Sequence, residues 1–322
     1  MTDETQAATD SAPDRPELSI VVGILSGGRE PTETCFAALE PSLKDRRVEC
    51  IVPYDARLEQ VDALAERVPL ADFVDARDRI DMKRFGEFSR EHHDVLRAIG
   101  LGRARGRIVA LLEDHGTPSP EWLGAVLDAH RDDHAAVGGA VENGVDRILN
   151  WAVYYCDFGR YQNPVPAGPA EFLSDSNTAY KREALESVRE QWADAFHETA
   201  VNWELRRRGE RMRLDPSMVV YQTRRTLRFG SALGERFVWG RSFAGTRCAE
   251  MSPAKRVVLA GLSFLLPALL TWRIVSMAFG KRRNLGRLAL ALPLIGVLQS
   301  IWATGEFVGY VTGRTGGPAS DD

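Results

Sequence analysis

The chain has 322 residues, a formal net charge of -4 at pH 7 and 44% hydrophobic residues, which fits one large α/β domain with an appendage or two modest domains. The 4 cysteines are scattered with no C-x-x-C pair, which excludes the usual zinc or redox motif and fits a reduced, cytosolic setting. Residues 1–16 lack an apolar core, so they are expected to form a disordered tail and not a signal peptide. Residues 206–256 contain about thirteen Lys or Arg but only about four Asp or Glu. This excess of positive charge favours contact with phosphate or an anionic membrane.

Predicted strands and helices alternate along the first third of the chain. Strands are expected at 18–25, 48–53, 71–74 and 108–112, and helices at 31–43, 58–67 and 88–104. The short links between them favour right-handed βαβ units and a parallel sheet. Beyond this point the alternation weakens. The pattern predicts a strand at 135–141, an apolar and aromatic segment at 148–155, a Pro/Gly loop at 162–170, a helix at 199–208 and a strand at 218–221.

An acidic cluster follows the most apolar of these strands. Residues 108–112 are all apolar, as in a strand buried on both faces, and Glu113, Asp114 and His115 come directly after them. Ligands of open α/β sheets bind at the carboxyl ends of the strands, so we interpret this cluster as a site. The alternative is a polar strand end that caps the next turn. Asp114 is expected to point away from its two neighbours, unless a backbone kink lets it exchange roles with Glu113.

Two apolar runs close the chain, at 257–272 and 288–303, with Lys281, Arg282 and Arg283 between them. Each run is about sixteen residues, short of the roughly twenty that cross a bilayer. A spanning hairpin would place the basic turn on the side opposite the α/β domain, against the positive-inside tendency. We therefore predict two helices lying in the cytoplasmic leaflet, with Trp239, Trp272 and Trp302 near the headgroups. A spanning hairpin is the alternative.

Five segments, in order, resemble motifs of the family 2 glycosyltransferases of the GT-A fold. They are L-R-A-I-G-L-G-R-A-R-G at 96–106, L-E-D-H-G-T-P at 112–118, S-D-S-N-T-A-Y-K-R at 174–182, H-E-T through L-R-R-R-G at 197–209, and L-D-P at 214–216. The resemblance covers 17–225 and implies a mostly parallel, Rossmann-like sheet flanked by helices. Residues 226–322 are then an amphipathic and hydrophobic helical region associated with the membrane.

The resemblance also implies roles for the donor site. His115 stands where the family has a metal-binding aspartate, and Glu113 corresponds to the aspartate that contacts the ribose or the metal. Imidazole suits Mn²⁺ better than Mg²⁺, and either divalent ion is expected. The remaining residues implied to bind the nucleotide sugar are Asp55, Arg97, Asp114, Asp175 and Asn177. The alternatives are a turn-forming role for Asp55 and a solvated helix position for Arg97. For His92 and His93 we predict surface or packing roles.

Glu198 corresponds to the family's catalytic aspartate and is the predicted general base, with His197 as the alternative base. Helix capping is the purely structural reading of Glu198. Gln222, Arg224 and Arg225 fall where membrane-associated relatives hold a diphosphate, and Arg228, Arg236 and Arg241 extend them into a predicted basic collar for a lipid phosphate.

The expected function is inverting transfer of a sugar from a nucleotide-sugar donor to a lipid-linked or glycan acceptor at the cytoplasmic membrane face. The expected partners are donor, acceptor and membrane lipids, and no nucleic acid. Two alternatives remain open. One is a catalytically silent nucleotide-sugar binder in the membrane. The other is a nucleotidyltransferase, whose Gly-rich phosphate loop is present only as the fragment 26–29.

Overall fold

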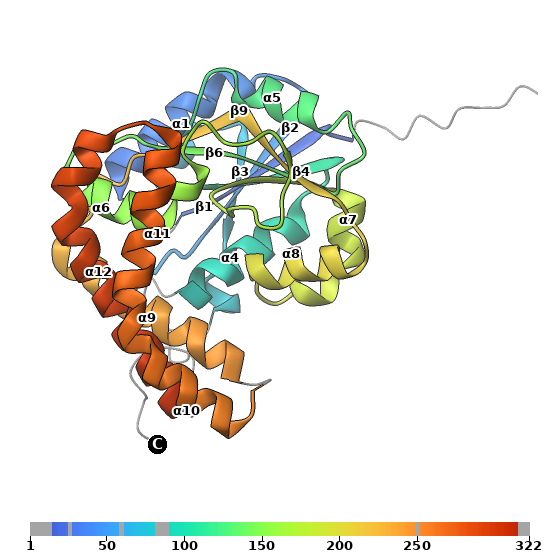
Figure 1. The fold of residues 1–322 in the computed structure, drawn as a ribbon. Helices are drawn as coiled ribbons and strands as arrows, with labels where there is room; N and C mark the ends of the chain where they lie inside the picture. The colour runs from blue at the N-terminus through green and yellow to red at the C-terminus, as the bar shows by residue number, and fades with distance from the viewer. Residues whose placement is uncertain (1–14, 25–27, 58–60, 81–89, 249–250, 315–322) are drawn as a thin grey trace, which may run out of the picture.

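The computed structural model describes residues 15–24, 28–57, 61–80, 90–248 and 251–314 (Figure 1). The predicted tail and the 26–29 turn therefore fall largely outside the described residues. The described helices are α1 (Arg29–Leu43), α2 (Asp62–Arg67), α4 (Arg90–Arg103), α5 (Trp122–Ala129), α6 (Ile148–Asp157), α7 (Arg182–Ser187), α8 (Glu198–Arg207), α9 (Phe229–Cys248), α10 (Pro253–Leu262), α11 (Leu266–Lys281) and α12 (Leu285–Thr312). A short 3-10 turn, η2 (Gly159–Tyr161), follows α6.

One sheet organises the α/β part of the molecule, in the order β3-β2-β1-β4-β8-β6-β9-β5 with β7 paired to β9. Its strands are β1 (Leu18–Gly23), β2 (Val48–Tyr54), β3 (Ala71–Asp75), β4 (Ile108–Glu113), β5 (Gly116–Pro118), β6 (Ala136–Asn143), β7 (Gly168–Pro169), β8 (Asn177–Lys181) and β9 (Met212–Gln222). The first four are parallel, as expected, but β8 pairs antiparallel to both β4 and β6. The sheet is therefore mixed beyond β4.

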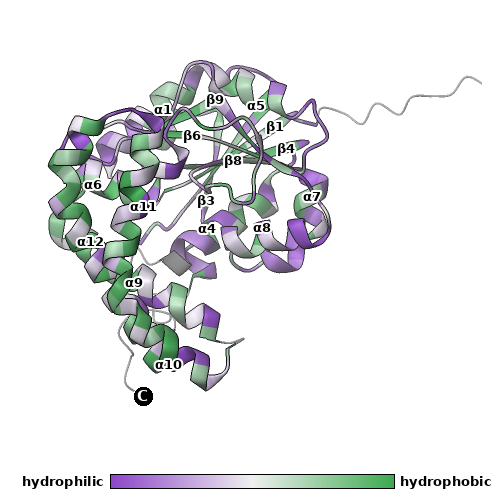
Figure 2. Ribbon diagram, viewed as in Figure 1, coloured by the Kyte–Doolittle hydropathy of each residue, from purple (hydrophilic) through white to green (hydrophobic). Residues whose placement is uncertain are grey.

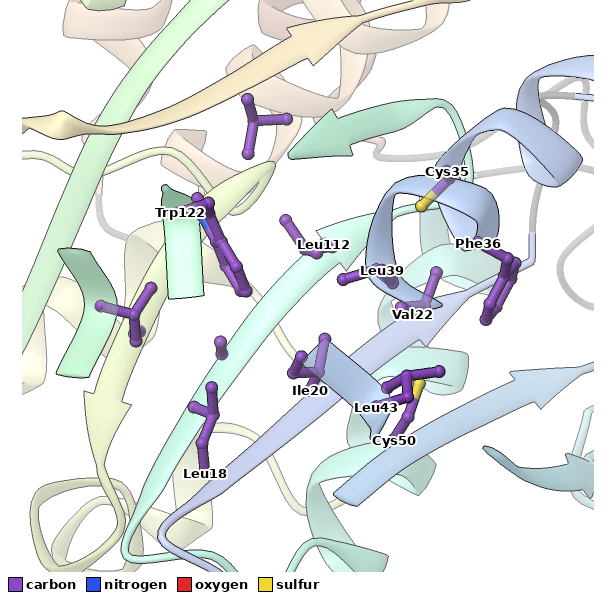
Figure 3. Packing of buried hydrophobic residues seen from close by; sticks show 14 of the residues in the cluster. Leu18, Ile20, Val22, Cys35, Phe36, Leu39, Leu43, Cys50, Leu112 and Trp122 are labelled. Atoms are coloured by element: carbon purple, nitrogen blue, oxygen red, sulfur yellow. The ribbon is translucent and has the colours of Figure 1, made fainter. Parts of the chain in front are cut away.

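Two apolar layers cover the sheet. On one face, α1 and α5 pack onto β1 and β4, with Trp122 and Leu112 fully buried among them (Figure 3). On the other face lie α4, α7 and α8. Gly100 lets α4 approach β1 closely, since a Cβ at that position would lie 2.3 Å from Val21 Cγ1. With both faces covered, ligand access is left to the carboxyl edge of the strands.

The C-terminal helices form a separate arm with its own core. Buried residues of α9, α11 and α12 pack with Trp151, Ala152, Tyr154 and Tyr155 of α6, so the apolar segment predicted at 148–155 is a helix of this arm (Figure 1). The domain boundary predicted near residue 225 stays a prediction. Although α6 precedes this boundary in the sequence, it packs with the C-terminal helices.

The helices α11 and α12 of the arm are rich in apolar residues (Figure 2). Two helical stretches, Pro253–Lys281 and Leu285–Thr312, are long and apolar enough to cross a membrane by length and composition. The expectation that they are too short was wrong, because the helices continue into the polar residues that flank each apolar run. Many large apolar side chains on these stretches are exposed, including Val257, Phe264, Leu265, Trp272 and Leu290.

The turn between α11 and α12 makes hydrogen bonds to the α/β part of the molecule. Lys281 Nζ donates to the carbonyl oxygen of Arg160 at 2.8 Å and also to that of Gln162, and Arg283 Nη1 donates to Glu142 Oε1 at 2.7 Å. Tyr155 Oη, from α6, donates to the carbonyl of Asn284 at 3.0 Å. The basic turn therefore lies on the same side as the sheet and not a bilayer thickness away from it.

Candidate active site

The acidic cluster lies where β4 ends and the chain turns into β5. His115 Nε2 and Glu113 Oε2 are 3.3 Å apart, and His115 Nδ1 lies 2.8 Å from Asp114 Oδ1. Asp114 is fully buried, and Thr32 donates to its second oxygen at 3.5 Å. Asp114 thus fixes the imidazole from behind, while Glu113 and the Nε2 edge of His115 share one side of the strand end. The expectation that Asp114 points away from both neighbours was wrong for His115, because the chain leaves the strand after Glu113 and Asp114 Oδ1 contacts His115 Nδ1.

The charges in this cluster support one another. Burial acts against the charged forms, but His115 and Arg97 hold the pKa of Glu113 below its usual value. Burial also lowers the pKa of His115, yet Glu113 and Asp114 together raise it above the ordinary value for histidine. Gln222 Nε2 donates to Glu113 Oε2 at 2.9 Å and fixes the carboxylate from β9.

Arg97 joins the carboxylates of three separate segments. Its guanidinium lies 2.7 Å from Asp175, 3.2 Å from Glu113 and 3.5 Å from Asp94, and its side chain is only 5% exposed. Burial opposes its charge, but these carboxylates raise the pKa of Arg97. The solvated-helix reading of Arg97 is therefore wrong. We call Asp94, Arg97, Glu113 and Asp175 the Arg97 cluster.

Both candidate bases lie beside this cluster, at the beginning of α8. His197 Nδ1 is 2.8 Å from Asp94 Oδ2, and the imidazole is 52% exposed. Glu198 is partly exposed, and its negative charge favours the charged form of Arg97. The pKa of the buried Tyr180 phenol is raised, first by burial and then by the charge of Glu198. The tertiary structure thus brings residues 197 and 198 to the same cluster as Glu113.

Asp55 directly follows β2 at the same edge of the sheet. Both oxygens of its carboxylate accept hydrogen bonds from Arg57. Arg57 donates through Nε at 2.9 Å and Nη2 at 2.6 Å, and its backbone N–H donates at 3.0 Å. These bonds to Arg57 lower the pKa of Asp55, despite burial. His92 Nε2 lies 3.5 Å from the same carboxylate and is buried.

His93, for which a surface or packing role was predicted, is partly buried and lies within electrostatic range of Arg97 and His115. Burial and the charges of Arg97 and His115 lower the pKa of His93, which keeps its imidazole neutral near pH 7. A neutral imidazole next to an acid cluster can donate or accept a hydrogen bond. His92 and His93 therefore extend from Asp55 toward the acid cluster along one turn of α4.

The residues after β9 divide into two groups. Arg224 lies within electrostatic range of Glu113 and Asp114, whereas Arg225 is 56% exposed and pairs with Glu30 at 3.4 Å. Arg236 is 4% exposed and pairs with Asp157, so its predicted place in a headgroup-facing collar was wrong. Its hydrophobic surroundings on α9 explain why it needs a buried carboxylate partner.

Asn177 and Asp175 lie two residues apart but have different surroundings. Asn177 is fully buried: Trp122 Nε1 donates to its oxygen at 2.9 Å, and its nitrogen donates to the carbonyls of Ala140 and Met218. Both ends of this amide join elements of the protein, which suits a structural tie between β6, β8 and β9. The side chain of Asp175 is 20% exposed and faces Arg97, so of the two it is the better placed for a ligand.

Sequence reasoning missed several residues of the site. Asp94 had a local signal, because it precedes Arg97 by three residues on one helix, the spacing of an ion pair. Arg57 follows Asp55 by two residues and also had one. Glu235 of α9 pairs with Arg224 through both carboxylate oxygens, and no sequence pattern connects the two.

Carboxylates, a histidine and buried arginines thus lie together at the carboxyl edge of the α/β sheet, the edge at which ligands of such sheets bind. The family model described as "Glycosyl transferase family 2" matches residues 63–189, which contain α4, the acid cluster and the Asn177 segment. This match covers under half of the chain and supports a glycosyltransferase, an enzyme that takes a sugar from a nucleotide-sugar donor.

Comparisons with other known proteins gave remote likenesses only. No curated protein matches the sequence. Among solved structures, the mannosyltransferase PcManGT from Pyrobaculum calidifontis in complex with GDP-Man and Mn²⁺ is 17% identical, with a TM-score of 0.47 over 91% of this chain and 90% of that one. A structure described as a mycobacterial protein is 15% identical, with a TM-score of 0.45 over 70% of this chain and 73% of that one.

Proposed function

We propose that this glycosyltransferase is metal-dependent and inverting, and that it transfers the sugar to a lipid-linked or glycan hydroxyl at the cytoplasmic membrane face. The observation that carries the proposal is the pairing of His115 Nε2 with Glu113 Oε2 at the end of β4, 3.3 Å apart and within range of Arg97 and Arg224. A cation and a diphosphate both match this mixture of charges.

His115 and Glu113 fit a divalent ion chemically. The Nδ1 of His115 is held by Asp114, which leaves Nε2 as the ligand nitrogen, the arrangement typical of metal-binding histidines. Among the described residues no set of three His, Cys, Asp or Glu side chains could hold a metal by itself, so donor oxygens would complete the coordination. When bound, the ion would supply Lewis acidity to the departing diphosphate.

The other residues act on the sugar and the acceptor. Glu198 removes the proton of the acceptor hydroxyl while its oxygen forms a bond to the anomeric carbon. The bond from that carbon to the diphosphate oxygen breaks, and its electron pair stays with the nucleoside diphosphate. Arg224 faces the developing negative charge, and Asp175 orients the sugar. Attack opposite to the leaving group inverts the anomeric configuration.

Manganese dependence tests the metal site. We expect the purified protein to release nucleoside diphosphate from one member of a panel of nucleotide sugars when Mn²⁺ is present, and to stop when a chelator is added. His115→Ala should weaken the affinity for Mn²⁺ by roughly 10- to 100-fold. Since the pKa of His115 is raised and the metal needs neutral imidazole, the affinity for Mn²⁺ should rise as the pH increases above 6.5. The control is His134→Ala, in the loop between α5 and β6; equal losses in both variants would refute the assignment.

The helical arm supports a position in the membrane surface. Its two long helices are apolar enough to anchor the protein, and their basic turn is bound to the catalytic domain by Lys281 and Arg283. Because that turn stays with the domain, we favour helices lying in one leaflet over a spanning hairpin. Between α11 and α12 lies an apolar groove of about 790 Å³, lined by Ala268, Trp272, Gly296 and Ile301 among others, which suits the acyl chains of membrane lipids.

Vesicle binding tests the membrane surface. Phe264 and Leu265 are 75% and 63% exposed, so replacing both by aspartate should leave the fold intact while desolvated charges oppose insertion. We expect the fraction of protein that floats with anionic phospholipid vesicles to fall at least severalfold. The matched control is Leu70→Asp, 58% exposed on the catalytic domain, which should float like the parent. Unchanged flotation of the double variant would contradict this orientation.

A further inference from the structure

Glu235, on α9 of the helical arm, forms a two-point ion pair with Arg224 of the proposed donor site. Arg224 Nη1 donates to Glu235 Oε2 at 2.8 Å, and Arg224 Nη2 donates to Glu235 Oε1. The two side chains are only 19% and 25% exposed. A two-point contact of this kind fixes the plane of the guanidinium as well as its position.

Arg224 keeps hydrogen-bonding capacity beyond its contact with Glu235. The end-on grip uses one N–H of each terminal nitrogen, which leaves three of the five guanidinium donors. One of these, Nε, is buried and has no hydrogen-bond partner among the described residues. Burial lowers the pKa of Arg224, but the carboxylate of Glu235 and, less strongly, those of Glu113 and Asp114 raise it. The guanidinium therefore lies within electrostatic range of the proposed metal site.

The helix that carries Glu235 is itself held firmly. Its next residue, Arg236, makes a buried ion pair with Asp157 at the end of α6. Farther along, α9 packs closely on α12, because Gly305 carries no side chain: a Cβ there would lie 2.2 Å from the carbonyl oxygen of Phe237. The arm thus meets the donor site at Glu235, and the next residue, Arg236, ties the same helix to α6 of the arm.

We propose that Glu235 is a positioning residue for the donor, which acts through Arg224 and makes the helical arm part of the donor site. The proposal rests on the proposed role of Arg224 toward the diphosphate. Glu235 holds the guanidinium in the plane that the diphosphate meets, so the cation need not be ordered when the donor binds. Without that carboxylate, Arg224 retains its charge but not its place.

The test is Glu235→Gln in the full-length protein, which keeps the shape of the side chain and removes its charge. We expect the Kd for GDP and UDP with Mn²⁺, and the KM for the donor, to rise roughly tenfold, since a misplacement of about 1 Å can cost that much or more. The kcat should fall as well, because Arg224 also faces the negative charge that develops on the departing diphosphate. Arg224→Lys should give a similar loss, and the double variant should be little worse than either single one.

Two controls separate positioning from folding. Glu186→Gln removes a carboxylate that pairs with Arg182 and Arg189 far from the site, and Arg247→Met loosens α9 from Tyr310 without touching Arg224. Both should keep the parent Kd for the nucleotides. An unchanged Kd in Glu235→Gln, or an equal rise in Arg247→Met, overturns the role of Glu235. Absence of donor turnover in the parent protein would instead count against the proposed function, because the nucleotide Kd is measured without turnover.

Discussion

Glu198→Gln is expected to lower kcat by about 10²- to 10⁴-fold, the usual contribution of a positioned general base, while the Kd of the donor stays near the parent value. Glu198 begins α8 beside the Arg97 cluster, and its charge acts on Arg97 and Tyr180. The amide of glutamine keeps the size and a hydrogen bond but accepts no proton at neutral pH. Steady-state kinetics with saturating donor and acceptor, together with nucleotide titration, measure the two quantities.

The neighbouring histidine decides between the two candidate bases. His197 Nδ1 is bound to Asp94, so its Nε2 is held in one direction, as in a histidine that takes up a proton. If Glu198 is the base, His197→Asn should cost far less in kcat than Glu198→Gln. The opposite ranking would assign the base to His197, and full activity of Glu198→Gln would exclude Glu198 from the proton transfer.

Arg97→Met is expected to reduce the free energy of unfolding by about 3–5 kcal/mol, the range measured when one partner of a buried ion pair is removed. Methionine fills much of the volume but leaves Asp94, Glu113 and Asp175 without their shared cation. Donor turnover should also be lost, since Glu113 and Asp175 would repel each other in the site. Denaturant unfolding of the purified protein measures the first effect.

The same helix offers a matched control for this loss. Arg103 of α4 pairs with Asp72 at 2.9 Å, but both side chains are more than half exposed. Arg103→Met should therefore change the free energy of unfolding by about 0–1 kcal/mol, as is typical of surface ion pairs. If Arg97→Met cost no more than this control, the Arg97 cluster would have no structural role.

The sequence predicted the parts of the site that depend on a single strand or helix. Five consecutive apolar residues indicated the buried β4, and the alternation of strand side chains placed Glu113 and His115 on the same side of its end. The order of strands and helices predicted the parallel half of the sheet for the same reason: local periodicity records which face of an element is buried.

Relations between distant segments were decided by the tertiary structure alone. Asn177 lies in the expected segment, yet its buried amide ties Trp122 to β6 and β9, and Glu235 of α9 meets Arg224 only because the chain turns back after β9. The apolar runs near the C-terminus indicated a membrane surface, but contacts of Lys281 and Arg283 fixed the side on which their turn lies. A sequence pattern reports how much of a side chain is buried; which partner it meets depends on packing between elements that are far apart along the chain.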